Sequence, residues 1–261
     1  MNTNINMNIM KQVAEIARQA GVKILKIYNT DFQVKIKDDQ TPVTYADELA
    51  EKIIIKKLNT ELPFKYPIIS EEAATDGHIS NVSSLCFWLV DPLDGTKEFI
   101  NRNGDFTVNI GLIQNGVPIF GVVYVPAHNI TYMGGKLGSY KSKDGENYEK
   151  IKCRKFPSNG LTALVSRSHR SDNTTAYLSK FNIANEISAG SSLKFCKIAE
   201  GEADIYPRLG PTMEWDTAAA HSVLYSAGGH IETLDGKPLS YGKPDLRNPH
   251  FVAYGNGKVS K

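Results

Sequence analysis

The chain has 261 residues, enough for one large domain or for two closely packed smaller ones with a sizeable core. Its 30 Lys and Arg residues almost balance 28 Asp and Glu residues, so the net charge of +2 gives no reason to expect a nucleic-acid partner. Three widely spaced cysteines, without a Cys-x-x-Cys pair, argue against a disulfide framework and against a thiolate zinc site. We therefore expect a globular protein of a reducing, cytoplasmic compartment.

No uncharged apolar run approaches the ~20 residues that cross a bilayer, so no transmembrane segment is expected. Residues 1–8 lack the basic and apolar regions of a signal peptide and are expected to form a frayed polar tail. The sequence leaves two questions open: peripheral membrane association through a surface patch, and the choice between a monomer and a homodimer.

Apolar periodicity predicts the elements of the first part of the chain. In chain order they are a helix over 9–27, a strand over 32–37, a helix over 46–58, strands over 66–69 and 87–90, and a hairpin over 106–125 that turns at Asn115-Gly116. Asp47 would lie in the first turn of the second helix. The two short apolar strands each run directly into carboxylates, and ligand sites gather where strands end and the chain turns away.

A stretch rich in Gly, Ser and Lys, from Gly134 to Glu149, is the candidate boundary between two halves of one integrated unit. The N-terminal half would span residues 1–140 and the C-terminal half residues 150–261. Beyond the boundary an α/β alternation is predicted: a strand over 161–165, a helix over 173–181, a strand over 186–189, a helix over 192–200, a strand over 203–209, a helix over 216–227 and short terminal strands. The fold class is therefore α/β, or more broadly α+β.

Five acidic residues follow apolar strand-like runs or begin predicted helices: Asp47, Glu71, Asp91, Asp94 and Asp216. Hard cations such as Mg²⁺ take oxygen ligands, and two ions a few Å apart need a shared carboxylate with others around it. Taken singly, each acid is more simply explained as a helix cap or a surface residue, and capping is a real competitor for Asp216.

The segment Asp91-Pro92-Leu93-Asp94-Gly95-Thr96 favours the metal interpretation. After a buried strand it offers two carboxylates, the Leu93 carbonyl, and the amides of Gly95 and Thr96 at a predicted helix start, where phosphate oxygens bind. A plain Asp-Gly turn would explain neither the buried approach nor Glu71 after the neighbouring strand. The Asp-x-Asp-Gly-Thr nucleophile loop of haloacid-dehalogenase-type phosphatases has one residue between its aspartates, whereas two separate Asp91 from Asp94, so an acyl-phosphate mechanism is disfavoured.

The chain resembles the lithium-sensitive, inositol-monophosphatase-like superfamily of Mg²⁺ phosphatases over essentially its whole length. Four blocks carry the resemblance, in the family's order: Thr41-Pro42-Val43-Thr44-Tyr45-Ala46-Asp47, Ile69-Ser70-Glu71-Glu72, Asp91 to Phe99, and Trp215-Asp216-Thr217-Ala218-Ala219-Ala220. Lys97-Glu98-Phe99 is similar to the CysQ-type 3′(2′),5′-bisphosphate nucleotidases, as are Phe106 to Ile110 and Val165 to His169. The fold that this resemblance implies is the layered αβαβα sandwich of inositol and sugar phosphatases.

The resemblance also implies the roles of the acidic residues. Glu71, Asp91 and the Leu93 carbonyl would hold one Mg²⁺, while Asp91, Asp94 and Asp216 would hold a second; a third, weaker ion near Glu71 and Asp47 is left open. Asp47 and Thr96 would orient the attacking water and help to deprotonate it, so that hydrolysis proceeds in line without a covalent intermediate.

A nucleotide with two phosphates needs further donors in the site. Bisphosphate nucleotidases suggest His169, Ser191, Lys194 and Arg208 for this role, beside the phosphate contacts of Asp94, Gly95, Thr96 and Asp216. The competing interpretation makes Lys194 and Arg208 solvated surface charges and His169 an ordinary loop residue.

Three functions remain in competition. The first is hydrolysis of 3′-phosphoadenosine 5′-phosphate to AMP and phosphate, which Lys97-Glu98-Phe99 favours. The second is a sister phosphatase that acts on an inositol phosphate or a sugar bisphosphate. The third is a non-catalytic sensor of a phosphate ligand, which predicts the loss of a metal carboxylate or of Thr96; none is missing.

Overall fold

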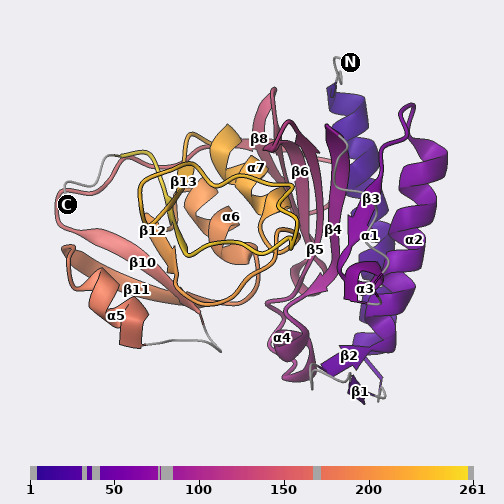
Figure 1. Ribbon diagram of the computed structural model, residues 1–261, viewed down its shortest axis with the longest axis horizontal. Coiled ribbons are helices and arrows are strands. Elements are labelled where there is room, and N and C mark those ends of the chain that lie inside the picture. Colours follow the sequence, from indigo (N-terminus) through magenta and orange to yellow (C-terminus); the bar gives the residue numbers. More distant parts are fainter. Residues whose placement is uncertain are drawn as a thin grey trace.

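The computed structural model of the chain describes residues 5–30, 34–36, 42–75, 77, 85–166 and 172–257. Within these residues, layers of helices and sheets alternate across the molecule: two helices, a seven-stranded sheet, two helices, a five-stranded sheet and a last helix (Figure 1). This is the αβαβα order that the family resemblance implies.

The seven-stranded sheet is a meander with one parallel edge. Its strands lie in chain order: β3 (Ile68–Ser70), β4 (Cys86–Asp94), β5 (Thr107–Gln114), β6 (Val117–Val125), β7 (Ile130–Gly135), β8 (Gly138–Ser142) and β9 (Glu149–Ile151). Only β3 and β4 pair in parallel; all other neighbours in this sheet are antiparallel. The Asn115-Gly116 turn joins β5 to β6, as predicted.

Two long helices, α1 (Met7–Tyr28) and α2 (Tyr45–Glu61), cover the outer face of this sheet (Figure 1). The Asn6 side chain caps α1 by accepting a hydrogen bond from the Ile9 amide at 3.0 Å. Successive residues of a strand point to opposite faces, so Trp88 on β4 packs in the core beneath α1 and α2, whereas Leu89 packs in the core on the inner face.

Short elements join the longer helices and strands of this half of the fold. They are β1 (Val34–Ile36), which pairs with β2 (Pro42–Thr44), the short helices α3 (Glu71–Thr75) and α4 (Thr96–Ile100), and the 3₁₀ turn η1 (Pro126–His128). α3 directly follows β3, and α4 directly follows the turn at the end of β4. Both short helices therefore begin at the carboxylates that the sequence marks as metal ligands.

The second sheet is mixed, with the strand order β11 (Ile183–Ala189), β10 (Leu161–Ser166), β12 (Ile205–Arg208), β14 (Phe251–Tyr254) and β13 (His230–Thr233). β10 pairs in parallel with both β11 and β12, and β14 is antiparallel to its neighbours. Helix α5 (Asp172–Leu178) lies outside this sheet (Figure 1).

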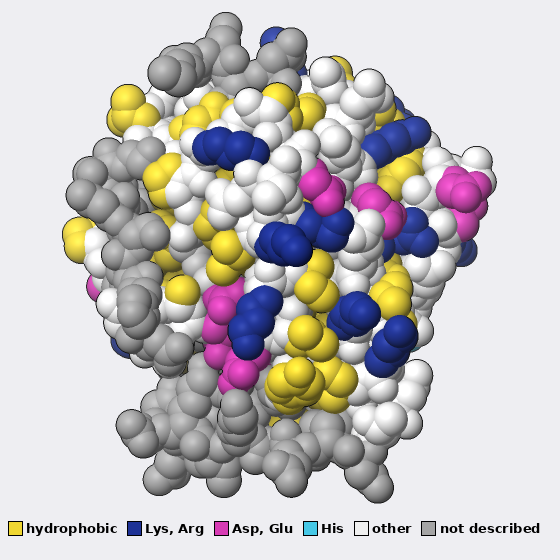
Figure 2. Space-filling view, turned by 90° about the vertical axis from the view of Figure 1, so that its right-hand side faces the viewer, with side chains coloured by type: hydrophobic (Ala, Val, Ile, Leu, Met, Phe, Trp, Pro, Cys, Tyr) yellow, Lys and Arg dark blue, Asp and Glu magenta, His cyan; other side chains and the backbone are white. Residues whose placement is uncertain are grey.

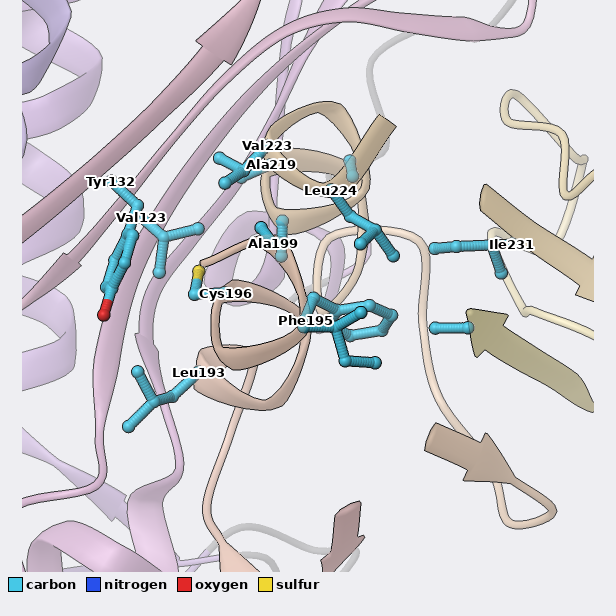
Figure 3. Packing of buried hydrophobic residues seen from close by; sticks show 14 of the residues in the cluster. Val123, Tyr132, Leu193, Phe195, Cys196, Ala199, Ala219, Val223, Leu224 and Ile231 are labelled. Atoms are coloured by element: carbon cyan, nitrogen blue, oxygen red, sulfur yellow. The ribbon is translucent and has the colours of Figure 1, made fainter. Parts of the chain in front are cut away.

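Helices α6 (Leu193–Ala199) and α7 (Ala218–Ser226) fill the space between the two sheets. Figure 3 shows apolar side chains meeting there from three sides, among them Val123 and Tyr132 of the first sheet, Phe195 and Cys196 of α6, Val223 and Leu224 of α7, and Ile231 of β13. Because both sheets contribute to this one core, the two sheets are held together by apolar packing.

Most predicted elements are confirmed, but several details differ, among them β2, α3 and β7, which were not predicted. The stretch from Gly134 to Glu149 contains β8 and the ends of β7 and β9, so it forms part of the first sheet and is not a plain linker. Strand β4 continues through Asp91 to Asp94, beyond its predicted end at Val90. The division of the chain into two halves stays a prediction.

The outer face formed by α1 and α2 carries mixed charge. Figure 2 shows Lys and Arg side chains spread over this face, with acidic and hydrophobic side chains between them. Among the described residues, no helix combines the length and the apolar character that crossing a membrane requires.

Helix α7 approaches the first sheet closely because glycines lie beneath it. A Cβ atom added to Gly121 on β6 would come within 2.2 Å of the Ala219 carbonyl oxygen, and one added to Gly134 on β7 would lie 2.4 Å from the Val223 Cα. These are backbone atoms of a packed helix, which cannot rotate away as a flexible side chain does. The two glycines therefore set the distance between α7 and the sheet.

We expect Gly121→Ala to lower the free energy of unfolding by about 1–3 kcal/mol, because α7 must move to admit the methyl group. Chemical denaturation measures this change. Gly255→Ala is the matched control: its added Cβ would meet nothing closer than 3.5 Å, so stability should change little. Equal stabilities of the two variants would contradict the close-approach argument.

Candidate active site

The carboxyl end of β4 carries two aspartates separated by an irregularity in the strand. Asp91 pairs opposite Asn109 of β5 and Asp94 opposite Thr107, and the register shifts between the two pairs. Such a bulge bends a strand and redirects its side chains. Asp91 Oδ1 accepts a hydrogen bond from the Leu93 amide at 3.1 Å, which fixes the turn.

A cavity of about 300 Å³ opens at this strand end. Its lining brings together ten residues predicted as site residues: Glu71, Asp91, Leu93, Asp94, Gly95, Thr96, Ser191, Lys194, Arg208 and Asp216. They come from the ends of β4 and β12, the starts of α3, α4 and α6, and the segment before α7. Residues more than 100 positions apart in sequence thus share one pocket.

The other two predicted site residues are Asp47 and His169. Asp47 does not line the cavity, but it is buried in the first turn of α2, and its charge acts on Asp91. His169 lies outside the described residues, together with Arg167 and Ser168.

Burial and mutual repulsion dominate the electrostatics of the carboxylates. Burial, followed by the charges of Glu71 and the other acids around it, raises the pKa of Asp91 well above its usual value. Burial raises the pKa of Asp94 to about 6, against the opposing effects of Lys194 and of the Ser192 amide. Burial and the Asp94 charge raise the pKa of Asp216 to about 7. A cation in the cavity would relieve this repulsion.

The donor chemistry of the cavity fits Mg²⁺, because carboxylate oxygens and the Leu93 carbonyl are the hard ligands that this ion takes. Among the described residues, however, no three acidic, histidine or cysteine side chains are grouped closely enough to hold a metal on their own. Asp91, Asp94 and Asp216 would therefore hold an ion only together with water or phosphate oxygens. Mg²⁺ characteristically keeps such ligands.

Two cations, Lys194 and Arg208, line the cavity beside the acids. Lys194, in the first turn of α6, is only 5% exposed; its ammonium donates to the Ser191 carbonyl at 2.7 Å and lies 5.2 Å from the centre of the Tyr206 ring. Arg208, at the end of β12, donates to the Pro211 carbonyl at 2.9 Å and to the Ser166 hydroxyl at 3.3 Å. Lys194 is therefore buried and is not a solvated surface charge, whereas Arg208 is half-buried; both line the cavity, and their roles stay predictions.

A buried polar network behind Asp94 was not singled out from the sequence. The Ser192 backbone amide donates to Asp94 Oδ2 at 2.6 Å, and the Asn109 side-chain amide donates to the same oxygen at 3.4 Å. The Ser192 hydroxyl in turn donates to Asn109 Oδ1 at 2.7 Å and bonds the Thr107 hydroxyl at 3.0 Å. The signal was available: Thr107 and Asn109 are polar residues two positions apart in an otherwise apolar strand, so they share one face.

The backbone at the cavity floor has little steric freedom. Gly95 has a φ of 91°, and a Cβ atom there would lie 3.3 Å from both Ser191 Cβ and Glu98 Oε2. Opposite it, the Gly190 amide donates to Asp105 Oδ2 at 2.9 Å, and a Cβ on Gly190 would lie 2.8 Å from the Asp105 carbonyl. The turn before α6 is thereby fixed against the segment between α4 and β5.

Comparison with known proteins agrees with this geometry. Residues 6–257 match the model of the inositol monophosphatase family. The chain is 42% identical over 247 residues to a protein of Escherichia coli strain K12 named 3′(2′),5′-bisphosphate nucleotidase CysQ, which covers 93% of this chain and 98% of the relative. It is 43% identical over 241 residues to the protein of the same name from Buchnera aphidicola, covering 91% of this chain and 89% of the relative.

The fold also matches solved structures. The crystal structure of CysQ from Bacteroides thetaiotaomicron superposes with a TM-score of 0.82 at 38% identity, covering 98% of this chain and 100% of that one. The inositol monophosphatase from Anabaena superposes with a TM-score of 0.75 at 25% identity, covering 95% and 91%. Given the family match over nearly its whole length, the chain belongs to the inositol monophosphatase family.

Proposed function

We propose that this chain is a Mg²⁺-dependent phosphomonoester hydrolase that removes the 3′-phosphate of 3′-phosphoadenosine 5′-phosphate, giving AMP and phosphate. The observation that carries the proposal is the composition of the cavity, whose lining combines Asp91, Asp94 and Asp216 with Lys194 and Arg208. The acids suit metal ions that bind the reacting phosphate, and the cations suit a second phosphate on the same substrate. The name shared by the bacterial relatives supports this substrate.

The proposed metal ligands divide into two sets. Glu71, Asp91 and the Leu93 carbonyl would hold one ion, and Asp91, Asp94 and Asp216 a second, so that Asp91 is shared. A third ion near Glu71 stays open. Bound Mg²⁺ would supply Lewis-acid stabilisation of the phosphate charge and would make a coordinated water more acidic.

The chain's own residues would orient the reaction. The backbone at Gly95 and Thr96 lines the cavity beside the aspartates, where its N–H groups can bind phosphate oxygens. The Thr96 hydroxyl, with Asp47 buried near Asp91, would hold the attacking water and take up its proton. No nucleophilic side chain is required, so the phosphate passes directly to water.

The second phosphate would bind at Lys194 and Arg208. Arg208 offers a planar fork held by two hydrogen bonds, and Lys194 contributes a buried positive charge. Ser191, with a φ of 42°, lines the same cavity, and His169 keeps its proposed role from the sequence. The proposed partner is thus a small nucleotide carrying two phosphates, with no nucleic acid bound.

The setting that we propose is cytoplasmic. All three cysteines are buried and form no disulfide, as a reducing compartment favours.

Phosphate release from 3′-phosphoadenosine 5′-phosphate, inositol 1-phosphate and fructose 1,6-bisphosphate tests the substrate, with and without Mg²⁺ and Li⁺. We expect kcat/KM to be highest for the nucleotide.

Asp91→Asn should lower activity by at least about 100-fold, because it removes the shared metal ligand. Asp235→Asn, at an exposed carboxylate paired with Lys237, is the matched control and should retain full activity. Preference for inositol phosphate would refute the nucleotidase assignment, and an active Asp91→Asn enzyme would refute the metal mechanism.

Arg208→Met tests the site of the second phosphate. We expect KM for 3′-phosphoadenosine 5′-phosphate to rise by about 10-fold, which corresponds to about 1.4 kcal/mol of lost binding. KM for 3′-AMP, which lacks the second phosphate, should rise much less. Steady-state kinetics with both substrates measure the difference. An equal rise for the two nucleotides would place the second phosphate elsewhere.

The raised carboxylate pKa values predict how pH changes the stability of the metal-free protein. Asp94 and Asp216 titrate at about 6 and 7 when folded, above their usual value of 3.8, so the folded state holds protons that the unfolded state has released. Stability is therefore expected to fall as pH rises from about 4 to 7, by up to several kcal/mol in total.

Mg²⁺ should reverse this loss, because it binds the ionised carboxylates in competition with protons. We expect added Mg²⁺ to raise Tm by several degrees at pH 8 and very little at pH 5. Thermal unfolding at both pH values, with Mg²⁺ or with EDTA, measures the effect. A Mg²⁺ shift that is as large at pH 5 as at pH 8 would contradict it.

A further inference from the structure

The segment that carries Asp216 is fastened to the loop before β14 by a buried carboxylate outside the cavity. Glu214, two residues before Asp216, is completely buried. Its Oε2 accepts a hydrogen bond from the Gly242 amide at 2.7 Å, and its Oε1 accepts from the Lys243 amide at 3.0 Å. The Lys243 ammonium lies 2.5 Å from the same Oε1. Glu214 does not line the cavity; its carboxylate binds Gly242 and Lys243.

Further bonds run along both sides of the Asp216 segment. The Glu214 amide donates to the Leu246 carbonyl at 2.8 Å. The Asn248 side-chain amide donates to the Met213 carbonyl at 2.8 Å and to the Thr217 hydroxyl at 3.0 Å. The residues immediately before and after Trp215-Asp216 are therefore fixed to one loop, residues 241–248.

A directed chain of hydrogen bonds completes this attachment. The Thr217 hydroxyl donates its proton to the Glu214 carbonyl, so it can only accept from the Tyr241 hydroxyl, 3.2 Å away. Because the Tyr241 hydroxyl donates its only proton to Thr217, it must accept a hydrogen bond from His221 Nδ1, which lies 2.9 Å away. Burial lowers the pKa of His221 to about 3, so the ring is neutral and protonated on Nδ1.

Asp216 depends on the geometry that these bonds impose. Its Oδ2 accepts a hydrogen bond from the Met213 amide at 2.9 Å, so the carboxylate is oriented by a residue of the same fastened segment. When a buried carboxylate loses its hydrogen-bond donors, the folded state is destabilised far more than when an exposed carboxylate does. The Glu214 contacts therefore hold residues 241–248 firmly in place. Displacing residues 241–248 would release Met213 and with it Asp216.

We propose that Glu214 is a positioning residue of the reaction, which fixes the Met213–Thr217 segment so that Asp216 presents its carboxylate to the metal. This inference rests on the proposed function, in which Asp216 is a metal ligand. Glu214 acts on the metal only through its neighbours, as partners outside the ligand shell commonly do.

Glu214→Gln tests the proposal with little change of shape. The amide can accept one of the two backbone N–H bonds, but its NH₂ group faces the other donor and the Lys243 charge is left without its partner. We expect the Mg²⁺ concentration for half-maximal activity to rise about 10-fold or more. Substrate KM at saturating Mg²⁺ should change less than 2-fold, roughly, because Asp216 is then occupied.

Asp204→Asn is the matched control. Asp204 is equally buried and also combines an Arg154 ion pair with a backbone donor, the Thr162 amide at 2.7 Å. It precedes β12, whereas the cavity residue Arg208 lies at the opposite end of that strand. We expect comparable loss of thermal stability in the two variants but an unchanged Mg²⁺ requirement in Asp204→Asn.

Isothermal titration with Mg²⁺ alone provides a readout that does not require activity. We expect weakened Mg²⁺ binding in Glu214→Gln and wild-type binding in Asp204→Asn.

If Glu214→Gln does not fold, Tyr241→Phe breaks the hydroxyl chain with little change of packing and should also weaken Mg²⁺ binding. Wild-type Mg²⁺ affinity in a folded Glu214→Gln or Tyr241→Phe variant would overturn the proposal. Failure of the unmodified protein to bind Mg²⁺ or to release phosphate would instead overturn the proposed function.

Discussion

Repulsion among buried carboxylates is the constraint on which the rest of this site depends. Asp91 is almost completely buried, and the charges of Glu71, Asp94, Asp216 and Asp47 all act on it. Carboxylates in such a place hold protons or bind a cation. Keeping these acids together therefore lowers the stability of the protein. A bound cation would offset this loss by relieving the repulsion.

The surrounding structure fixes the acids relative to one another. The bulge in β4 separates Asp91 from Asp94, and the Ser192 amide reaches Asp94 from the turn before α6. That turn is fixed against the first half of the molecule by the Gly190 contact with Asp105. The cavity is thus a joint product of both sheets, and apolar packing of α6 and α7 between them sets its dimensions (Figure 3).

The two cations of the cavity explain how one family fold can serve different phosphate esters. Lys194 lies on α6, between the two sheets, and Arg208 lies at the end of β12 in the second sheet; both line the cavity together with the acids. The acids suit the reaction common to metal-dependent phosphatases, whereas the cations can discriminate by the charge of the remaining substrate. In this chain the two groups meet at Asp94, whose Oδ2 is held by Ser192 and whose charge is balanced in part by Lys194.

The sequence by itself determined the α/β fold class, most helices and strands, and the candidate acids, because these follow from local periodicity and from residues adjacent in the chain. Resemblance added the layered αβαβα architecture, the cationic residues and the roles of the acids; these roles stay predictions. Only the tertiary structure decided that Lys194 is buried in the cavity wall, that Asn109 lies behind Asp94, and that Glu214 fastens the Asp216 segment. The physical reason is that burial and hydrogen-bond partners across distant segments depend on how layers pack, which the pattern within a single segment does not encode.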